Sequence, residues 1–535
     1  MDSAAPDTII VVAIRRLERD EGLDRNLPLM TAPHARTPDA ISTRWLALAA
    51  PSVLAAATIV SLLADFSAPM FDAWRPLGIT VASTLIVQFT TTLVLRDRLR
   101  GAYATGILVS ITLGLWALVG ILLVIPAWWW SLGAVRRLKG RASSGPFPIV
   151  PISRFSSTLA GIFLLLSVGR VVLAFSPWDS IPAASTIELP GSGGPDIFVV
   201  LLDGYPRADT LENDFGIDNA PFISSLENEG FVVDGDSRTN YMKTWLTITS
   251  LFHTQFVSGI PAFDDPPPDP SAQYRLASRA IEQAPFVKAL RKRGYEIISS
   301  RSSFTETDLI GADRVLDAGQ PTNFENHVME VTPIANVLEN LSPGLLGRLQ
   351  SDAVLEGLDQ LRSVARTPSD RPIFMWSHLM APHTPFTEDA VGDPVPMPDC
   401  YPHSCSLWDH YVTVLGMTPK EYGERLAGYL EYTNQHVLDV IGEIARERRN
   451  AVVIVMSDHG ARYDPDNPDE HFRSFFAART PGVDDVFESG MYPVNVFRSV
   501  SNAYFGTDLP LLPDRSWFSS PLLLDLIPWD YPGAQ

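Results

Sequence analysis

Four long apolar segments in the first third of the chain constrain its fold most strongly. They are Trp45–Leu63, Leu77–Leu95, Gly106–Trp130 and Ser156–Phe175. Each reaches the roughly 20 residues that a helix needs to cross the hydrocarbon core of a bilayer. Helices in the core of a soluble protein rarely stay apolar on every side for so long. The segments therefore predict an integral membrane protein with several crossings.

Basic residues between these segments bear on orientation. The basic residues after the second and third segments are Arg96, Arg98, Arg100, Arg136, Arg137, Lys139 and Arg141. The positive-inside rule places both groups in the cytoplasm, but a single crossing between them would put them on opposite sides. Either the run from Gly106 to Val135 is a short hairpin, which gives five crossings, or one basic loop lies outside. With five crossings and an inside N-terminus, the rest of the chain is extracytoplasmic.

Composition divides the chain into consecutive regions. Residues 1–43 are polar and mixed in charge without the layout of a signal peptide, so we expect a disordered cytoplasmic tail. The membrane region covers 44–176. Residues 177–195 contain Pro, Ser and Gly, which indicates a linker. A folded domain is expected over 196–520 and a C-terminal tail over 521–535.

The part of the chain after the membrane region is acidic and carries most of the net charge of -20. A protein that binds nucleic acid needs a basic face, so this acidity argues against a nucleic-acid partner. It suits a domain that stays dispersed in solution.

Cys400 and Cys405, in DCYPHSCS, are the two cysteines of the chain. In an oxidising compartment they would close a small disulfide loop. The alternative is a metal knuckle, but a second pair of cysteines to complete four ligands is missing.

Strand and helix patterns alternate from Asp196 onward. The expected strands are Ile197–Leu202, Phe231–Val233, Glu296–Ser299, Ile373–Ser377, Val452–Met456 and Phe475–Ala478. The expected helices are Ala220–Glu229, Thr244–Val257, Ala277–Arg293, Asp352–Val364 and Pro419–Arg446. This alternation predicts an α/β fold with a doubly wound, mostly parallel sheet and helices on both faces. The Pro-rich stretch from Asp264 to Tyr274 is expected to be a loop.

Two of the expected strands end at carboxylates. Ile197–Leu202 runs into Asp203, and Asp458 and His459 come just after Val452–Met456. Open α/β sheets place their sites at the carboxyl ends of the strands. Each Asp could instead cap a turn, but together with His459 the pair predicts a site for one divalent metal ion. Mixed oxygen and nitrogen donors suit Mn or Zn better than Mg or Ca.

Thr244, in NYMKTWLTITSLF, is expected in the first turn of a helix. The unpaired N–H groups and the helix dipole favour a developing alkoxide there. A metal or a base could lower the pKa of the hydroxyl, so Thr244 could be a fourth metal ligand and the attacking group. The alternative is an N-cap, a role that Thr often fills.

Three further residues could contact an anionic substrate. His383 follows an expected strand in SHLMAPHTPF and could bind a phosphate oxygen or protonate a leaving group, or it could make only a structural hydrogen bond. His378 in the same stretch is expected to be structural. His471 and Arg473 precede the last expected strand and could hold an anion, Arg473 through its bidentate fork; a solvated turn is the alternative.

Taken together, these segments resemble the alkaline phosphatase superfamily in its sulfatase-like branch, and especially the membrane-anchored lipoteichoic acid synthases and phosphoethanolamine transferases. The matching segments are VVLLDGYPRADTL, RTNYMKTWLTITSLF, SHLMAPHTPF, EYTNQHVLDVI, VIVMSDHG and YFGTDLPLLPDRSWF. The resemblance implies that Asp203, Asp458 and His459 are metal ligands. It implies that Thr244 is the nucleophile, that His383 contacts the substrate phosphate and that His471 supplies another substrate contact.

The chain departs from true sulfatases at the nucleophile. Those enzymes need C-x-P-x-R, in which the Cys or Ser is converted to formylglycine, and Thr244 cannot be so converted. The stretch CYPHS at Cys400–Ser404 copies half of that motif, but it lacks the Arg and comes too late in the chain. We therefore expect the sulfatase fold without the sulfatase reaction.

The resemblance implies a membrane-anchored, metal-dependent enzyme that transfers a phospho-head group of the phosphoglycerol or phosphoethanolamine type through a covalent phospho-Thr intermediate. Attachment to the lipid bilayer suggests a lipid-linked or phospholipid donor and a cell-envelope acceptor. One alternative is a hydrolase of the same fold, a phosphodiesterase or phosphatase rather than a sulfuric ester hydrolase, in which water is the acceptor. Another is a catalytically inactive member that binds a partner.

Overall fold

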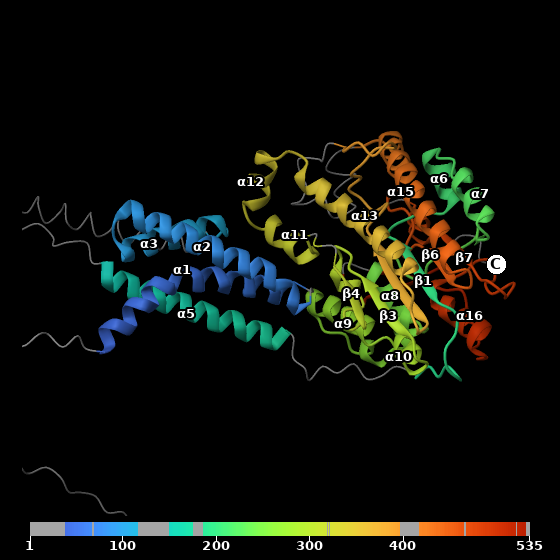
Figure 1. Cartoon of the computed structure of the whole chain (residues 1–535), viewed down its shortest axis with the longest axis horizontal. Coiled ribbons are helices and arrows are strands. Elements are labelled where there is room, and N and C mark those ends of the chain that lie inside the picture. Colours follow the sequence, from blue (N-terminus) through green and yellow to red (C-terminus); the bar gives the residue numbers. More distant parts are fainter. Residues whose placement is uncertain are drawn as a thin grey trace, which may run out of the picture. The chain divides into compact units, whose positions relative to one another are not determined.

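The computed structural model describes residues 38–66, 69–115, 149–174, 186–317, 319, 321–395, 417–464, 467–519 and 522–530. Its first elements, labelled in Figure 1, are helices α1 (Pro38–Asp65), α2 (Trp74–Leu95), α3 (Arg98–Thr112) and α5 (Ile149–Ala174), with the short 3₁₀ helix η1 (Met70–Ala73). The strands that follow are β1 (Ile197–Leu202), β2 (Val232–Val233), β3 (Glu296–Ser300), β4 (Arg314–Leu316), β5 (Ile373–Leu379), β6 (Val452–Met456), β7 (Phe476–Arg479), β8 (Ser516–Ser519) and β9 (Leu526–Trp529).

The later helices alternate with these strands. The α-helices are α6 (Ala208–Phe215), α7 (Ala220–Asn228), α8 (Thr244–His253), α9 (Pro270–Glu282), α10 (Pro285–Lys292), α11 (Asn323–Glu330), α12 (Ile334–Leu341), α13 (Leu345–Arg366), α15 (Pro419–Glu447) and α16 (Pro493–Phe505). The 3₁₀ helices are η2 (Val257–Gly259), η3 (Pro261–Phe263), η4 (Thr305–Thr307) and η5 (Pro468–Phe472).

A seven-stranded sheet with the order β2-β7-β6-β1-β5-β3-β4 forms the centre of the α/β domain. The strands β6, β1, β5, β3 and β4 are parallel, while β7 runs antiparallel to β6 and β2 antiparallel to β7. The predicted doubly wound, mostly parallel sheet is therefore confirmed. Because β5, β1 and β6 are adjacent and parallel, the residues that follow them meet at one edge of the sheet.

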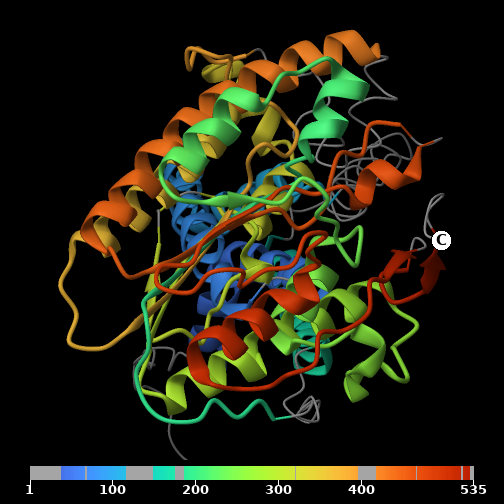
Figure 2. The same cartoon turned by 90° about the vertical axis from the view of Figure 1, so that its right-hand side faces the viewer.

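Strand β1 is buried on both faces, as its unbroken apolar run predicts. Phe198, Val200 and Leu202 pack with residues of α6, α7, α13 and α15. The alternate residues of β1 pack with α8, α10 and α16. Figures 1 and 2 show these two groups of helices on opposite sides of the sheet. Both layers hold the central strands rigid at the edge where their carboxyl ends meet.

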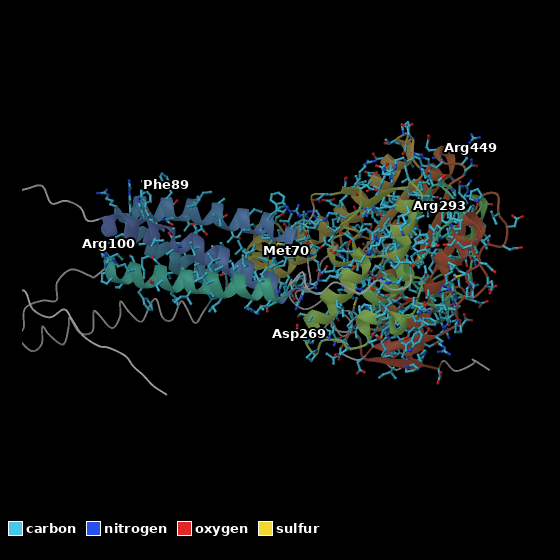
Figure 3. All side chains as sticks on the ribbon, turned by 90° about the horizontal axis from the view of Figure 1, so that it is seen from below. Met70, Phe89, Arg100, Asp269, Arg293 and Arg449 are labelled. Atoms are coloured by element: carbon cyan, nitrogen blue, oxygen red, sulfur yellow. The ribbon has the colours of Figure 1, made fainter. Side chains whose placement is uncertain are left out.

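Three helical stretches are long and apolar enough to cross a membrane: Trp45–Asp65, Met70–Leu95 and Ile149–Ala174. Large apolar side chains project outward from them, and Phe89 on α2, labelled in Figure 3, is 66% exposed. Such exposure is expected of surfaces that face lipid. The structure thus has helices at the first, second and fourth predicted segments. The third begins within α3, and its residues beyond Leu115 lie outside the described part of the chain.

Two expectations about local structure are wrong. The predicted helix Ala277–Arg293 is two helices, α9 and α10, because Pro285 lacks the N–H that would continue α9 and instead starts α10. The expected loop from Asp264 to Tyr274 contains the start of α9, whose Asp269 side chain caps Ala272 N. The hairpin β8–β9 was not predicted, and β9 lies in the predicted C-terminal tail. Cys400 and Cys405 fall outside the described residues.

Candidate active site

Asp203 follows the last residue of β1 and is held by the neighbouring strand, since its backbone N–H donates to Leu379 O at 3.0 Å. Its two carboxylate oxygens face different histidines. Oδ2 lies 3.1 Å from Nε2 of His378, and Oδ1 lies 3.2 Å from Nε2 of His459. Gly204 permits this arrangement, because its φ is +70° and a Cβ there would lie 3.1 Å from the His459 ring.

Asp458 and His459 leave β6 beside Asp203. One Asp458 oxygen accepts from Gly204 N at 3.0 Å, and the other lies 3.4 Å from His459 Nε2. The His459 Nδ1 atom lies 2.8 Å from Gly460 O, so it carries a proton and donates to that carbonyl. The lone pair of a neutral His459 is then on Nε2, which faces the carboxylates.

Three side-chain atoms from the residues that follow β1 and β6 face one another without hydrogen-bond partners. Among the described residues, the buried atoms Asp203 Oδ1, Asp458 Oδ2 and His459 Nε2 make no hydrogen bond. Buried polar atoms in proteins are almost always satisfied. Acceptor atoms that face one another at 3.2 and 3.4 Å are stable only with a proton or a cation between them. The residues present therefore fit a divalent cation, and their mixed oxygen and nitrogen donors are those that transition metals prefer.

His383 belongs to the same cluster. Ligand atoms of Asp203, His383 and His459 all lie within 4.8 Å of one another. The Nδ1 atom of His383 lies 2.6 Å from Thr384 O, which makes Nδ1 the protonated nitrogen and leaves Nε2 available. The residue expected to contact substrate is therefore also close enough to the cluster to serve as a ligand.

The charges of this cluster are set by its burial and by its histidines. Burial would raise the pKa of Asp203, but His383, His378 and His459 outweigh it and hold that pKa well below its usual range. Burial lowers the pKa of His383, and the positive charge of Arg462 adds to this effect. At neutral pH the pair is therefore a carboxylate and a neutral imidazole, the forms that bind metal ions.

Thr244 is the first residue of α8, and neither it nor the preceding Lys243 caps the helix with its side chain. It lines a cavity of about 330 Å³ together with Asp203 and His383. The side chains of Lys243 and Arg462 line the same cavity and provide two positive charges. A hydroxyl at a helix N-terminus, beside a candidate metal cluster and two cations, is suited to attack on a phosphate.

Helix α8 also fixes the turn that carries Asp458. The hydroxyl of Thr247 donates to the Asp458 carbonyl oxygen at 2.9 Å, and that of Thr239 donates to the same oxygen at 2.8 Å. Thr247 therefore links the helix that begins at Thr244 to the candidate metal ligands.

A comparison with protein-family models identifies the family of this chain. The family model described as sulfatase matches residues 195–484, more than half of the chain. The chain belongs to the sulfatase family. No sequence among the curated proteins compared matches it significantly.

Several solved structures are distantly similar to this sulfatase-family chain. The C-terminal periplasmic domain of EcEptC from Escherichia coli in complex with Zn is 13% identical, with a TM-score of 0.42, over 65% of this chain and 96% of that chain. The integral membrane protein lipooligosaccharide phosphoethanolamine transferase A from Neisseria meningitidis is 13% identical, with a TM-score of 0.35, over 68% and 71%. The lipoteichoic acid synthase LtaP from Listeria monocytogenes is 14% identical, with a TM-score of 0.33, over 60% and 74%. Similarity at this level does not indicate the reaction.

The two remaining candidates lie apart from the cavity of this sulfatase-family domain. His471 is buried against Phe518, and burial, together with the nearby charge of Arg462, lowers its pKa to about 2. Arg473 is paired with Asp469 at 2.8 Å and Asp209 at 3.4 Å. Neither is among the described residues that line the cavity. The structure brings Asp203, Thr244, His383, Asp458 and His459 to one sheet edge, and it places Arg473 in an ion-pair network.

Sequence reasoning missed three residues of the site. Lys243 adjoins Thr244, and Arg462 comes three residues after His459, so both could have been noted as charges next to expected site residues. His378 was expected to be structural, but it lies fully buried beside Asp203. Its signal in the sequence is weak, because a histidine within a buried strand is more often a packing residue.

Proposed function

We propose that this member of the sulfatase family is a membrane-anchored, metal-dependent phosphotransferase in which Thr244 is the nucleophile. It would take a phospho-head group of the phosphoglycerol or phosphoethanolamine type from a lipid-linked donor and pass it to a cell-envelope acceptor. The observation that carries the proposal is the convergence of unpartnered acceptor atoms from Asp203, Asp458 and His459 at one sheet edge. Thr244 and Asp203 line the same cavity there.

The residues that would hold the metal are Asp203, Asp458, His459 and Thr244, with His383 within reach of the same position. A divalent ion bound there lowers the pKa of a coordinated hydroxyl and offsets the negative charge of a phosphate. Nitrogen and oxygen donors together favour Mn or Zn over Mg or Ca.

The other groups of the cavity bind the phosphate and carry protons. The N–H groups at the start of α8 and the charges of Lys243 and Arg462 stabilise the phosphate oxygens. In the first step the Thr244 oxygen bonds to phosphorus and the bond to the lipid alcohol breaks. The proton that leaves Thr244 passes to neutral His383 and then to the departing alcohol. In the second step an acceptor hydroxyl bonds to phosphorus, the bond between Thr244 and phosphorus breaks, and the proton of the acceptor passes through His383 to the Thr244 oxygen.

The proposal is tested by intact mass spectrometry of the full-length protein in detergent, incubated with Mn or Zn and a phospholipid. A covalent adduct that maps to Thr244 and is absent from Thr244→Ala would support it, and its mass would identify the group transferred. Thr249→Ala is the matched control, since Thr249 is another buried threonine of α8 that does not line the cavity. Unchanged turnover in Thr244→Ala would remove Thr244 from the mechanism. Release of the head group without transfer to an added alcohol would identify a hydrolase.

A further inference from the structure

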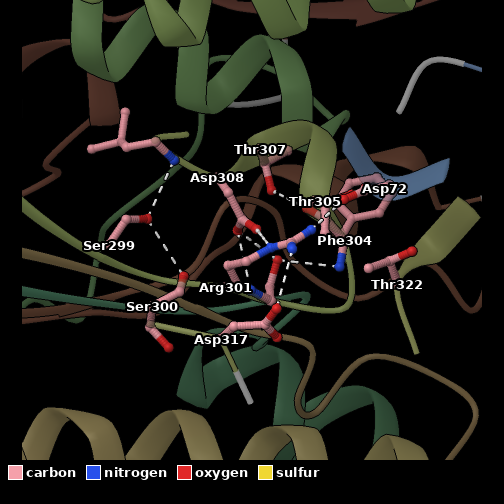
Figure 4. A network of polar contacts seen from close by, with 12 residues as sticks. Asp72, Ser299, Ser300, Arg301, Phe304, Thr305, Thr307, Asp308, Asp317 and Thr322 are labelled. Atoms are coloured by element: carbon pink, nitrogen blue, oxygen red, sulfur yellow. Dashed lines mark hydrogen bonds and ion pairs between the residues drawn. The ribbon is translucent and has the colours of Figure 1, made fainter. Parts of the chain in front are cut away.

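Asp72, in the short 3₁₀ helix between α1 and α2, is a buried carboxylate that faces the α/β domain. The residue is only 2% exposed. One of its oxygens accepts from the Arg301 guanidinium and the other from the Thr305 hydroxyl (Figure 4). A charge so deeply buried is stable only when it is paired and hydrogen-bonded. Both partners of Asp72 lie more than two hundred residues away in the chain.

Arg301 attaches this loop to the sheet. It is the first residue after β3, and its backbone N–H donates to Leu316 O at 2.8 Å. Its guanidinium group bonds to Asp72 and lies 3.4 Å from Asp317 (Figure 4). It also stacks 4.6 Å from the centre of the Phe71 ring. Phe71 and Asp72 are neighbours in η1, so one arginine holds the loop through an ion pair with Asp72 and a cation–π contact with Phe71.

A single 3₁₀ turn, η4, connects this contact to the candidate metal site. Its first residue, Thr305, bonds to Asp72. Its last residue, Thr307, has its hydroxyl 2.8 Å from Nδ1 of His378. The other nitrogen of His378 lies 3.1 Å from Asp203 Oδ2. Thr305, Thr307, His378 and Asp203 are all buried, so water does not compete for these contacts.

The final contact determines how Asp203 is oriented. A carboxylate only accepts, so Nε2 of His378 donates to Asp203 Oδ2. This bond leaves Oδ1, the unpartnered atom, directed at His459. A group that hydrogen-bonds to an atom of a metal ligand other than the coordinating one commonly fixes the orientation of that ligand and influences the affinity of the site for metal.

We propose that Asp72 is a positioning residue for the active site. It holds η4 in place, and Thr307 and His378 transmit that position to Asp203. The site is then fully ordered only while the loop between α1 and α2 is seated on the α/β domain, which gives the membrane segment a role in the reaction besides anchoring. The inference rests on the proposed metal-binding function.

The test measures metal affinity, by competition of the full-length protein in detergent with a chromogenic Zn chelator. We expect Asp72→Asn and Thr307→Val to weaken Zn binding by about 10- to 100-fold, the usual effect of losing an outer-shell partner. Thr307→Ser keeps the hydroxyl and should restore wild-type affinity. The matched control is Glu325→Gln, which removes the ion pair between the start of α2 and α11, where Arg75 lies 2.8 and 2.7 Å from Glu325. It should bind Zn as the wild type does.

The melting temperature of each metal-free variant separates positioning from folding. If Asp72→Asn and Thr307→Val lower that temperature but bind Zn with wild-type affinity, Asp72 is only structural and the inference is wrong. If Asp72→Asn does not fold, Thr305→Val, which removes one hydroxyl, takes its place with the same expectation. A wild-type protein that binds no Zn or Mn would overturn the proposed function and this inference together. If the wild type and all the variants bind Zn with the same affinity, the inference about Asp72 is wrong while the proposed function stands.

Discussion

At the scale of single residues, Glu306 should make the stability of the fold depend on pH. It lies buried in η4, where Asn323 donates to its carboxyl group at 3.1 Å. Burial raises the pKa of Glu306 from 4.5 to about 8. The native state therefore keeps a proton that the unfolded chain loses above pH 4.5, and stability falls as pH rises from there towards 8. The loss is on the order of 5 kcal/mol.

The measurement is the melting temperature of the full-length protein in detergent between pH 5 and pH 8.5. Glu306→Gln keeps the shape and the neutral state, so it should remove the share of the decline that Glu306 contributes and melt higher than the wild type at pH 8.5; the raised pKa values of Asp308, about 7, and Glu470, about 8, account for the rest. Glu227→Gln, a substitution at an exposed carboxylate of α7, serves as the control and should follow the wild type. Parallel pH profiles for wild type and Glu306→Gln would show that Glu306 is not the titrating group.

The sequence allowed some residues of the site to be located more easily than others. Asp203 directly follows an apolar strand and Asp458 comes two residues after another, and a parallel sheet brings such positions to one edge whatever the loops do. Arg462 and His378 could not be assigned in the same way. Their roles depend on contacts with Met242 and Thr307, which come from distant parts of the chain and leave no local pattern.

At the scale of elements, Gly460 controls the turn that follows β6. A Cβ at this position would lie 2.1 Å from Glu470 O and 2.4 Å from Arg473 O, both of them backbone atoms that cannot move aside. Gly460→Ala should therefore displace the Asp458–His459 turn and destabilise the protein by about 1–3 kcal/mol. We expect a lower melting temperature and a weaker affinity for Zn, measured on the full-length protein.

Gly235 offers a matched comparison for this substitution. A Cβ there meets nothing within 4 Å, so Gly235→Ala should leave both the melting temperature and Zn binding as in the wild type. Wild-type behaviour of Gly460→Ala would mean that the turn is free to shift, and the close packing of this glycine would then be unimportant for the site.

Whether an element could be predicted depended on how strongly its own residues favour it. Strands β1 and β6 have the predicted bounds, because each is a run of apolar, mostly branched residues that ends in polar ones. Strand β4 was missed because it has three residues and little burial, so its pairing with β3 rather than its composition makes it a strand. The break between α9 and α10 was missed because apolar periodicity continues across Pro285.

At the scale of the whole molecule, contacts between the membrane helices and the α/β domain indicate which side of the membrane the domain occupies. The start of α2 is tied to the domain through Arg75 and Glu325. Its 22 residues span about 33 Å, enough to cross the bilayer core. The basic group Arg96, Arg98 and Arg100 at its other end is then on the opposite side. From the positive-inside rule we expect that group in the cytoplasm and the domain outside.

The ends of α3 and α5 bear on the number of crossings, which the sequence leaves at four or five. Gly114, just beyond α3, lies close to the domain: a Cβ added at this glycine would lie 3.4 Å from Val331 O. The last residue of α5, Ala174, accepts a hydrogen bond from Arg279 of the domain. Both α3 and α5 therefore run towards the domain side. If the run from Gly106 to Val135 is a hairpin, as the five-crossing interpretation of the sequence requires, we expect the basic group near Arg141 to be cytoplasmic too.

This topology predicts the labelling of single cysteines by a membrane-impermeant maleimide in right-side-out vesicles. In a background with Cys400→Ser and Cys405→Ser, Arg449→Cys, on the exposed surface of the domain (Figure 3), should be labelled at once. Arg98→Cys and Arg141→Cys should be labelled only after the vesicles are opened. If Arg141→Cys is labelled at once and Arg98→Cys is not, α2 still crosses the membrane but the number of crossings is four. Immediate labelling of Arg98→Cys would contradict the placement of α2, because that residue and the domain would then share one side of the membrane.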